Sequence, residues 1–217
     1  VTESGFFALS DVRDLHAYLR SCHRELAEGG AVASTKQLAL LVTAPPAAGK
    51  TSFISQLVMH SLPADGELGG GGGGGEESES ADGLRLVPIC IRVMDLQQKL
   101  RTREYAEAFA TSWNMVDAYL RVTLGSESER YLALRQLLMA RQALVLLDGL
   151  DEGGEHRAAI EAHITETLAP QQHLLVVTSR PNAVTARLAR RLQPSQRSAQ
   201  TLPRRGRSTP PRPHGPS

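Results

Sequence analysis

The feature that most constrains the fold is an apolar run that ends in three carboxylates, Leu146-Leu-Asp-Gly-Leu-Asp-Glu152. The run before the acids, residues 143–147, is continuously apolar, as in a strand that is covered on both faces of a parallel sheet. About a hundred residues earlier, another apolar run (38–43) leads into Ala44-Pro-Pro-Ala-Ala-Gly-Lys50-Thr51. Ligands of open parallel sheets bind outside the carboxyl ends of the strands, so we expect the loop and the acids to form one site.

Four runs of strand length recur along the chain, at residues 38–43, 86–93, 143–147 and 174–178. Segments with helical periodicity separate them, and these are long enough to return each strand parallel to the last. The sequence therefore predicts an α/β fold. The expected helices span residues 10–28, 51–62, 97–100, 105–124, 129–141 and 155–168.

The chain divides into three parts by composition. Residues 1–35 contain the amphipathic helix, with Ser10 as its cap and Gly29-Gly30 as its end, followed by a linker. Residues 36–192 form the core, interrupted at 65–83 by a glycine-rich and acidic insertion that we expect to be flexible. Residues 193–217 are rich in Arg, Pro and Ser, and we expect them to be disordered.

Charge is distributed unevenly along the chain. Residues 183–217 carry eight arginines and no acid, so the net charge of +1 leaves −7 for residues 1–182. A basic tail can bind nucleic acid through counterion release, but without interleaved aromatic residues this signal is unspecific. Nucleic acid is therefore not expected as a partner.

Several protein classes are disfavoured. No apolar stretch reaches the 18 or more residues that span a bilayer, and the amino end lacks a secretory signal, so we expect a cytoplasmic protein without a membrane partner. Cys22 and Cys90 lie far apart with no Cys-x-x-Cys spacing, which predicts reduced thiols and neither a disulfide framework nor a zinc site. The first residue is Val1 and not Met, which suggests an excised domain or an incomplete product.

The loop before residue 51 has the composition of a phosphate site. Backbone N–H groups and the positive end of a helix dipole offer closely spaced donors to a triphosphate. Gly49 allows close approach of the backbone, Lys50 would bridge the β and γ phosphates, and Thr51 would bind Mg²⁺. Pro45-Pro46 removes two amide donors, so the nucleotide-binding residues expected are Ala44, Ala47, Ala48, Gly49, Lys50, Thr51 and Ser52.

The seven glycines at 69–75 could be forced into a dinucleotide-binding fingerprint, but they follow a predicted helix and precede a strand, which is the reverse of what that motif needs.

The acids and one arginine complete the predicted site. Asp148 stands at the tip of its strand, where one carboxylate would bind Mg²⁺ together with Thr51. Asp151 or Glu152 would orient or deprotonate the attacking water. Arg180, in Val176-Val-Thr-Ser-Arg-Pro181, would contact the γ-phosphate from the end of the fourth run. Asp151, Glu152 and Arg180 are therefore the candidate catalytic residues.

Together, Asp148-Gly-Leu-Asp-Glu152, Thr178-Ser-Arg-Pro181 and the Lys50 loop resemble the NACHT domain of the STAND class of signalling ATPases. The run Val87-Pro-Ile-Cys-Ile-Arg-Val-Met-Asp-Leu96 also looks like that family's second strand, and the resemblance covers residues 36–182. It implies the three-layer P-loop NTPase sandwich of the ASCE type, with a mostly parallel five-stranded sheet, strand order 5-1-4, and the Arg180 strand between the Lys50 and Asp148 strands.

The resemblance also implies binding of ATP or dATP with Mg²⁺, slow hydrolysis, and a switch in which exchange of ADP for ATP opens the protein to oligomerise. The family continues into a helical bundle and a winged-helix domain that do not fit in the 35 residues after 182. Protein partners and self-oligomerisation would therefore depend on missing flanking domains.

Our hypothesis is a NACHT-like core with weak Mg²⁺-dependent ATPase activity. One alternative is a nucleotide-binding assembly scaffold without turnover. Another is a small P-loop kinase, which would need an arginine-rich lid, whereas the arginines after residue 186 stand among prolines and serines. The hypothesis and both alternatives require the Lys50 loop and the acids to share one pocket. If these groups lay more than about 10 Å apart with no cavity joining them, a shared pocket would be excluded.

Overall fold

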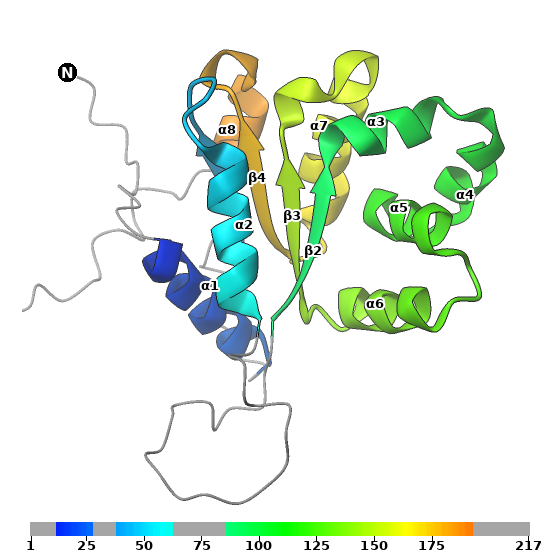
Figure 1. Cartoon of the computed structure of the whole chain (residues 1–217), viewed down its shortest axis with the longest axis horizontal. Coiled ribbons are helices and arrows are strands. Elements are labelled where there is room, and N and C mark those ends of the chain that lie inside the picture. Colours follow the sequence, from blue (N-terminus) through cyan, green and yellow to red (C-terminus); the bar gives the residue numbers. More distant parts are fainter. Residues whose placement is uncertain (1–11, 28–37, 63–85, 193–217) are drawn as a thin grey trace, which may run out of the picture.

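A computed structural model describes residues 12–27, 38–62 and 86–192 (Figure 1). The predicted cap at Ser10, the Gly29-Gly30 helix end, the 65–83 insertion and the 193–217 tail lie outside the described residues. The α/β class is confirmed, because four parallel strands alternate with helices along the chain.

The sheet contains β1 (Ala39–Thr43), β2 (Val87–Arg92), β3 (Ala143–Asp148) and β4 (Leu174–Ser179), in the order β1-β4-β3-β2. All three pairings are parallel, and every residue of β3 and β4 is buried. The fourth strand therefore lies between the strands that lead to Lys50 and Asp148. The described residues contain no fifth strand, so the order 5-1-4 stays a prediction.

Eight α-helices occur in the described part of the chain. They are α1 (Val12–Ala27), α2 (Lys50–Ser61), α3 (Val93–Arg101), α4 (Ala106–Thr111), α5 (Met115–Leu124), α6 (Glu129–Met139), α7 (Arg157–His163) and α8 (Ala186–Leu192). A π-helical turn, Ile164–Leu168, continues α7, and 3-10 turns at Leu150–Glu152 and Pro181–Ala183 follow β3 and β4.

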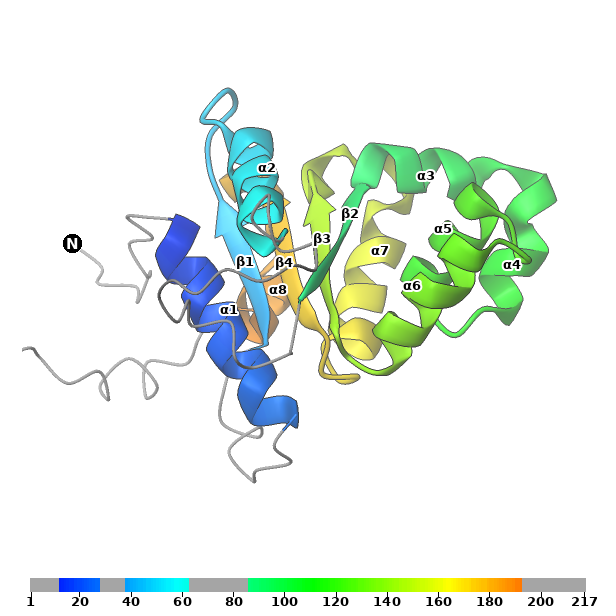
Figure 2. The same cartoon turned by 60° about the horizontal axis from the view of Figure 1, so that its bottom comes forward.

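The helices cover the sheet in layers. Figures 1 and 2 show α1 and α2 on one face, α7 and α8 on the other, and α3 to α6 grouped beside the edge strand β2. Leu15 and Leu19 of α1 pack with Leu57 of α2 against Leu144 and other residues of the first face. The apolar stripe predicted for residues 10–28 thus has the partner surface that it requires.

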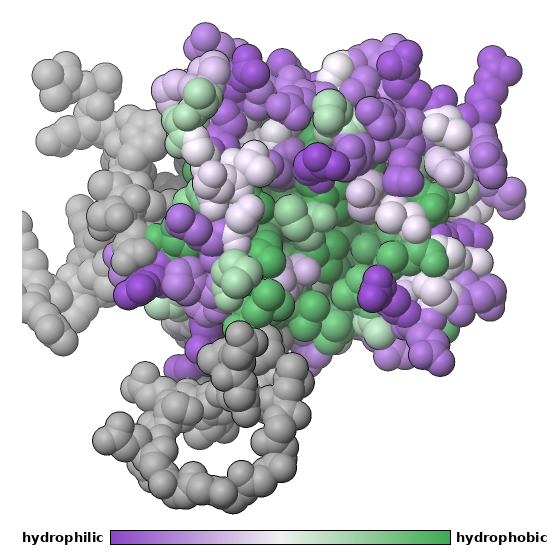
Figure 3. All heavy atoms as spheres, in the orientation of Figure 1, coloured by the Kyte–Doolittle hydropathy of each residue, from purple (hydrophilic) through white to green (hydrophobic). Residues whose placement is uncertain are grey.

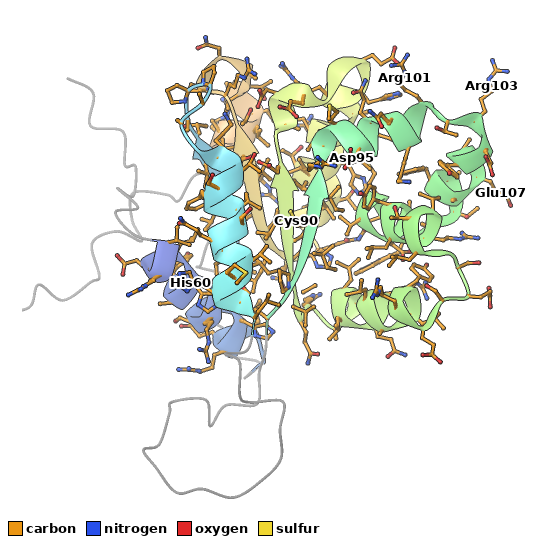
Figure 4. The ribbon with its side chains drawn as sticks, viewed as in Figure 1. His60, Cys90, Asp95, Arg101, Arg103 and Glu107 are labelled. Atoms are coloured by element: carbon orange, nitrogen blue, oxygen red, sulfur yellow. The ribbon has the colours of Figure 1, made fainter. Side chains whose placement is uncertain are left out.

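The α1–α2 contact also brings two histidines together. The ring centroids of His16 and His60 are 6.3 Å apart, and Figure 4 labels His60 on the side of α2 next to α1. Burial, then the charges of Arg20 and His60, lower the pKa of His16. His16 is half-buried, whereas His23, on the same helix, is buried, with 4% of its surface exposed.

The predicted strand 86–93 ends one residue early. Val93 is the first residue of α3, so this helix begins four residues before the predicted start at residue 97. Val93 and Leu96 are both buried and three positions apart, which is helical spacing. Asp95, in the first turn of α3 (Figure 4), pairs with Arg92 at 3.0 Å.

The prediction of one helix over 105–124 was wrong. The helix is interrupted at residues 112–114, between α4 and α5. Asn114 accepts a hydrogen bond from Asp117 N at 2.9 Å and so caps a new helix. Asp117 in turn accepts from Trp113 N at 3.0 Å. A side-chain cap of this kind interrupts the helix, although the helical spacing of the apolar residues continues through it.

The first arginines after residue 186 lie in a helix that was not predicted from the sequence. Residues 186–192 form α8, with Leu188 and Leu192 buried against the second face of the sheet. The helix forms because these leucines are four positions apart and give it an apolar stripe.

No helix in the described segments is both long and apolar enough to cross a membrane. Cys22 and Cys90 are not joined by a disulfide. Among the described residues, no group of three or more His, Cys, Asp or Glu side chains is arranged to hold a metal ion.

Candidate functional site

The predicted site residues lie at the carboxyl edge of the sheet. In Figure 1 the loop before α2 and the turns after β3 and β4 lie at the top of the molecule, where the strands end. The same rim is mostly hydrophilic in Figure 3, whereas apolar residues gather lower on this face. The edge is therefore built from polar turns on a buried apolar sheet.

The loop between β1 and α2 contains two residues with left-handed backbone conformations. Gly49 has φ +82°, and Ala47 has φ +60°, a left-handed conformation that costs a residue with a side chain roughly 1–2 kcal/mol. Phe53 N donates to Gly49 O at 2.8 Å, which starts α2 at the glycine. Residues 45–49 are exposed, so the loop and the amino end of α2 are open to a ligand.

Two side chains, from α2 and β4, converge on Asp148 at the end of β3. Thr51, in the first turn of α2, donates from Oγ1 to Asp148 Oδ2 at 2.9 Å. Thr178 of β4 donates to Asp148 Oδ1 at 2.5 Å and accepts from Gly149 N at 2.9 Å. Thr51 and Asp148 are 97 residues apart in sequence. Their contact places the Lys50 loop and the acidic strand end well within the separation of about 10 Å that a shared pocket allows.

Thr178 is the residue that sequence reasoning did not place in the site. It is fully buried, and its hydroxyl ties the tip of β4 to the tip of β3. A polar residue at the end of an otherwise apolar strand was the available signal. Its partner could be identified only once β4 was known to neighbour β3.

Lys50 lies over its own loop. Its ammonium group donates to Ala44 O at 3.2 Å and to Pro45 O at 3.4 Å. Ala44 in turn donates from its backbone N to Ser179 O at 3.2 Å, which joins the loop to the end of β4. The cation is thus held by neutral carbonyl groups on the loop that is predicted to bind phosphate.

Arg180 and Asp151, two of the candidate catalytic residues, are bonded to each other. Arg180 Nε lies 2.7 Å from Asp151 Oδ2, and Arg180 N donates to Asp151 Oδ1 at 3.0 Å. The Asp151 side chain is 8% exposed and that of Arg180 is 51% exposed. The neighbouring Glu152 is exposed, and its carboxyl group lies 3.2 Å from where a Cβ on Gly149 would be.

A hollow of about 450 Å³ opens where the loop meets the end of β4. Its lining consists of Pro45 and Pro46 from the loop, Arg180, and the 3-10 turn Pro181–Ala183. Arg180 therefore stands on the side of the site that faces the loop predicted to bind phosphate. The arrangement offers amide donors, a lysine and an arginine on one side, and carboxylates on the other.

Comparison with known proteins adds little. No protein-family model matches the chain, and no curated protein matches it. Among solved structures it is similar to C. elegans PCH-2, with 13% sequence identity and a TM-score of 0.45. The match covers 84% of this chain and 41% of that one, so the chain spans about two fifths of its length. The function is therefore inferred from the site geometry and from the sequence motifs that form it.

Proposed function

We propose that this chain binds ATP or dATP with Mg²⁺ at residues 44–52 and hydrolyses it slowly, as the nucleotide switch core of a STAND-type signalling protein. The observation that carries the proposal is the 2.9 Å contact between Thr51 Oγ1 and Asp148 Oδ2. In P-loop NTPases a loop Ser or Thr hydroxyl and a carboxylate at a strand end hold Mg²⁺ together. Here the Thr51 hydroxyl and the Asp148 carboxylate are in contact although they are 97 residues apart in the sequence.

The residues present fit a magnesium ion. Mg²⁺ takes oxygen ligands in near-octahedral geometry at 2.0–2.1 Å, so two adjacent ligands lie about 2.9 Å apart. Thr51 Oγ1 and Asp148 Oδ2 have that separation. When bound, Mg²⁺ would neutralise charge on the β and γ phosphates. Thr178 would keep the carboxylate in place through Asp148 Oδ1.

The loop would supply the remaining phosphate contacts. The first N–H groups of α2 have no partner inside the helix, and they lie at its positive end beside Gly49. Lys50 would exchange the carbonyl groups of Ala44 and Pro45 for phosphate oxygens, which are stronger acceptors for a cation. Ala47, Ala48 and Ser52 would contribute backbone amides.

The NACHT-like role is supported by the acidic extension Asp148-Gly-Leu-Asp-Glu152 and by Arg180. A switch needs the two nucleotides to bind two conformations with different affinity. Contacts to the γ-phosphate from Lys50 and Arg180 would supply that difference. Oligomerisation and protein partners would then follow from nucleotide exchange in a longer protein.

The test is binding of labelled ATP with Mg²⁺ to the wild type and to Lys50→Ala, with Lys99→Ala as the matched control. Lys99 lies on α3, where its ammonium is 5.3 Å from the centroid of the Tyr105 ring. Loss of a charge-assisted contact should weaken binding about tenfold or more at Lys50 and leave the Lys99 variant unchanged.

Equal ATP binding by all three proteins would remove the nucleotide proposal. Hydrolysis is then measured for the wild type and Glu152→Ala. Tight binding without phosphate release by the wild type would favour the scaffold alternative over the ATPase.

A further inference from the structure

Asp151 and Glu152 are adjacent carboxylates with different surroundings, and the difference separates their roles. Both oxygens of Asp151 bond to Arg180, one to the backbone N and one to Nε. The Glu152 side chain is exposed, and its carboxylate makes no hydrogen bond or ion pair with the other described residues. A carboxylate that orients water must have an oxygen within hydrogen-bond reach of it. The exposed Glu152 carboxylate is open to such a water, whereas the Asp151 side chain is 8% exposed and both of its oxygens already accept from Arg180.

We infer that Asp151 is a positioning residue, which holds Arg180 toward the phosphate loop, and that Glu152 alone serves the attacking water. The inference rests on the proposed function. Asp151 lies in the 3-10 turn after β3, and Arg180 directly precedes the 3-10 turn after β4. Their bidentate contact ties the two turns together across the edge of the sheet.

The geometry of the arginine shows what this contact leaves available. A guanidinium group carries five N–H donors, and the contact to Asp151 uses the single donor on Nε. The two terminal amino groups keep four donors in a planar fork, which suits a phosphate. The half-exposed side chain lines the hollow with Pro45 and Pro46, beside the loop proposed to bind the phosphates.

This arrangement predicts different defects for the two acids. Asp151→Asn loses the negative charge that fixes Nε, so Arg180 should lose its preference for one orientation and the protein its discrimination of ATP from ADP. Glu152→Gln should keep this discrimination and lose hydrolysis. Arg180→Ala should abolish the discrimination, and adding Asp151→Asn to it should change nothing further.

The experiment measures the affinities of a non-hydrolysable ATP analogue and of ADP, each with Mg²⁺, for the wild type, Asp151→Asn, Glu152→Gln, Arg180→Ala and the Asp151/Arg180 double variant. We expect the ratio of the two affinities to fall about tenfold or more in Asp151→Asn. Glu166→Gln is the matched control, because Glu166 also pairs with an arginine, Arg187, on the far side of the sheet, and its ratio should not change.

An unchanged ratio in Asp151→Asn, with hydrolysis lost as in Glu152→Gln, overturns the inference. A wild type that shows no preference between the two nucleotides overturns it as well. If the inference alone is wrong, Lys50→Ala still weakens ATP binding. If Lys50→Ala binds as the wild type does, the proposed function fails and the inference falls with it.

Discussion

Replacement of Thr178 by Val tests whether the buried hydroxyl holds the site together. Val has nearly the same shape, so the change removes the hydroxyl without opening a cavity. Two interactions are lost: the 2.5 Å hydrogen bond to Asp148 and the 2.9 Å hydrogen bond from Gly149 N. A hydrogen bond to a charged group is worth about 1.5–3 kcal/mol, and a buried donor without a partner costs about 1–3 kcal/mol.

The two terms share one network and are not additive, so we expect a loss of about 3 kcal/mol in the free energy of unfolding. Urea denaturation measures it, with an unchanged m-value showing that the compactness of the two states is retained. Thr165→Val is the matched control. Thr165 is also buried, but its hydroxyl donates to the carbonyls of Glu161 and Ala162 in its own helix.

The loss for Thr165→Val should stay within about 1 kcal/mol, since the hydroxyl only bonds back to carbonyls of the preceding turn. Thr178→Val should also raise the Mg²⁺ concentration needed for ATP binding, because Asp148 is then held by Thr51 alone. If Thr178→Val unfolds at the same urea concentration as Thr165→Val and binds Mg²⁺-ATP normally, the bridging role assigned to Thr178 is refuted.

Burial and then the Arg141 charge lower the pKa of His173 from 6.5 to about 4, so its contribution to stability is complete above pH 6.5 and is lost as the pH falls toward 4; about 2 kcal/mol should be gone by pH 5. His173→Phe, compared by urea unfolding at pH 7 and 5, should reduce this loss. Asp117→Ala should cost about 3 kcal/mol in the same assay, because Tyr131 and Trp113 N lose their acceptor; an unchanged midpoint would contradict it. Gly153→Ala should lower the thermal midpoint, at a cost of about 1–3 kcal/mol, because its Cβ would lie 2.9 Å from the Cα of residue 157.

The strands could be predicted to within one or two residues, because strands covered on both faces are continuously apolar and little else has that pattern. Helix boundaries were harder to predict. The break before α5 depends on the hydrogen bond that the Asn114 side chain accepts from Asp117 N. The early start of α3 depends on the burial of Val93 together with Leu96. Hydrophobic periodicity does not encode the first, and it shows the second only as the three-residue spacing of Val93 and Leu96.

The same distinction applies to the site. Residues within one motif, such as Gly49 and Thr51, have positions set by a local turn, so their sequence spacing is informative. The bonds from Thr178 to Asp148 and from Arg180 to Asp151 cross between strands that are about 30 residues apart in the chain. Which side chains meet there depends on strand order and register. The resemblance implied the position of the Arg180 strand, but hydrophobic periodicity gives neither the order nor the register.

The central position of β4 determines when the described sheet can form during synthesis. Residue 39 pairs with residue 175, and residue 144 pairs with residue 174, so among the described strands neither β1 nor this side of β3 has a neighbour until β4 has left the ribosome. Pairing of β2 with β3 can come first, since both are available by residue 148. A nascent chain that stops short of residue 174 would expose β1 as an unpaired apolar strand, and such edges recruit other chains.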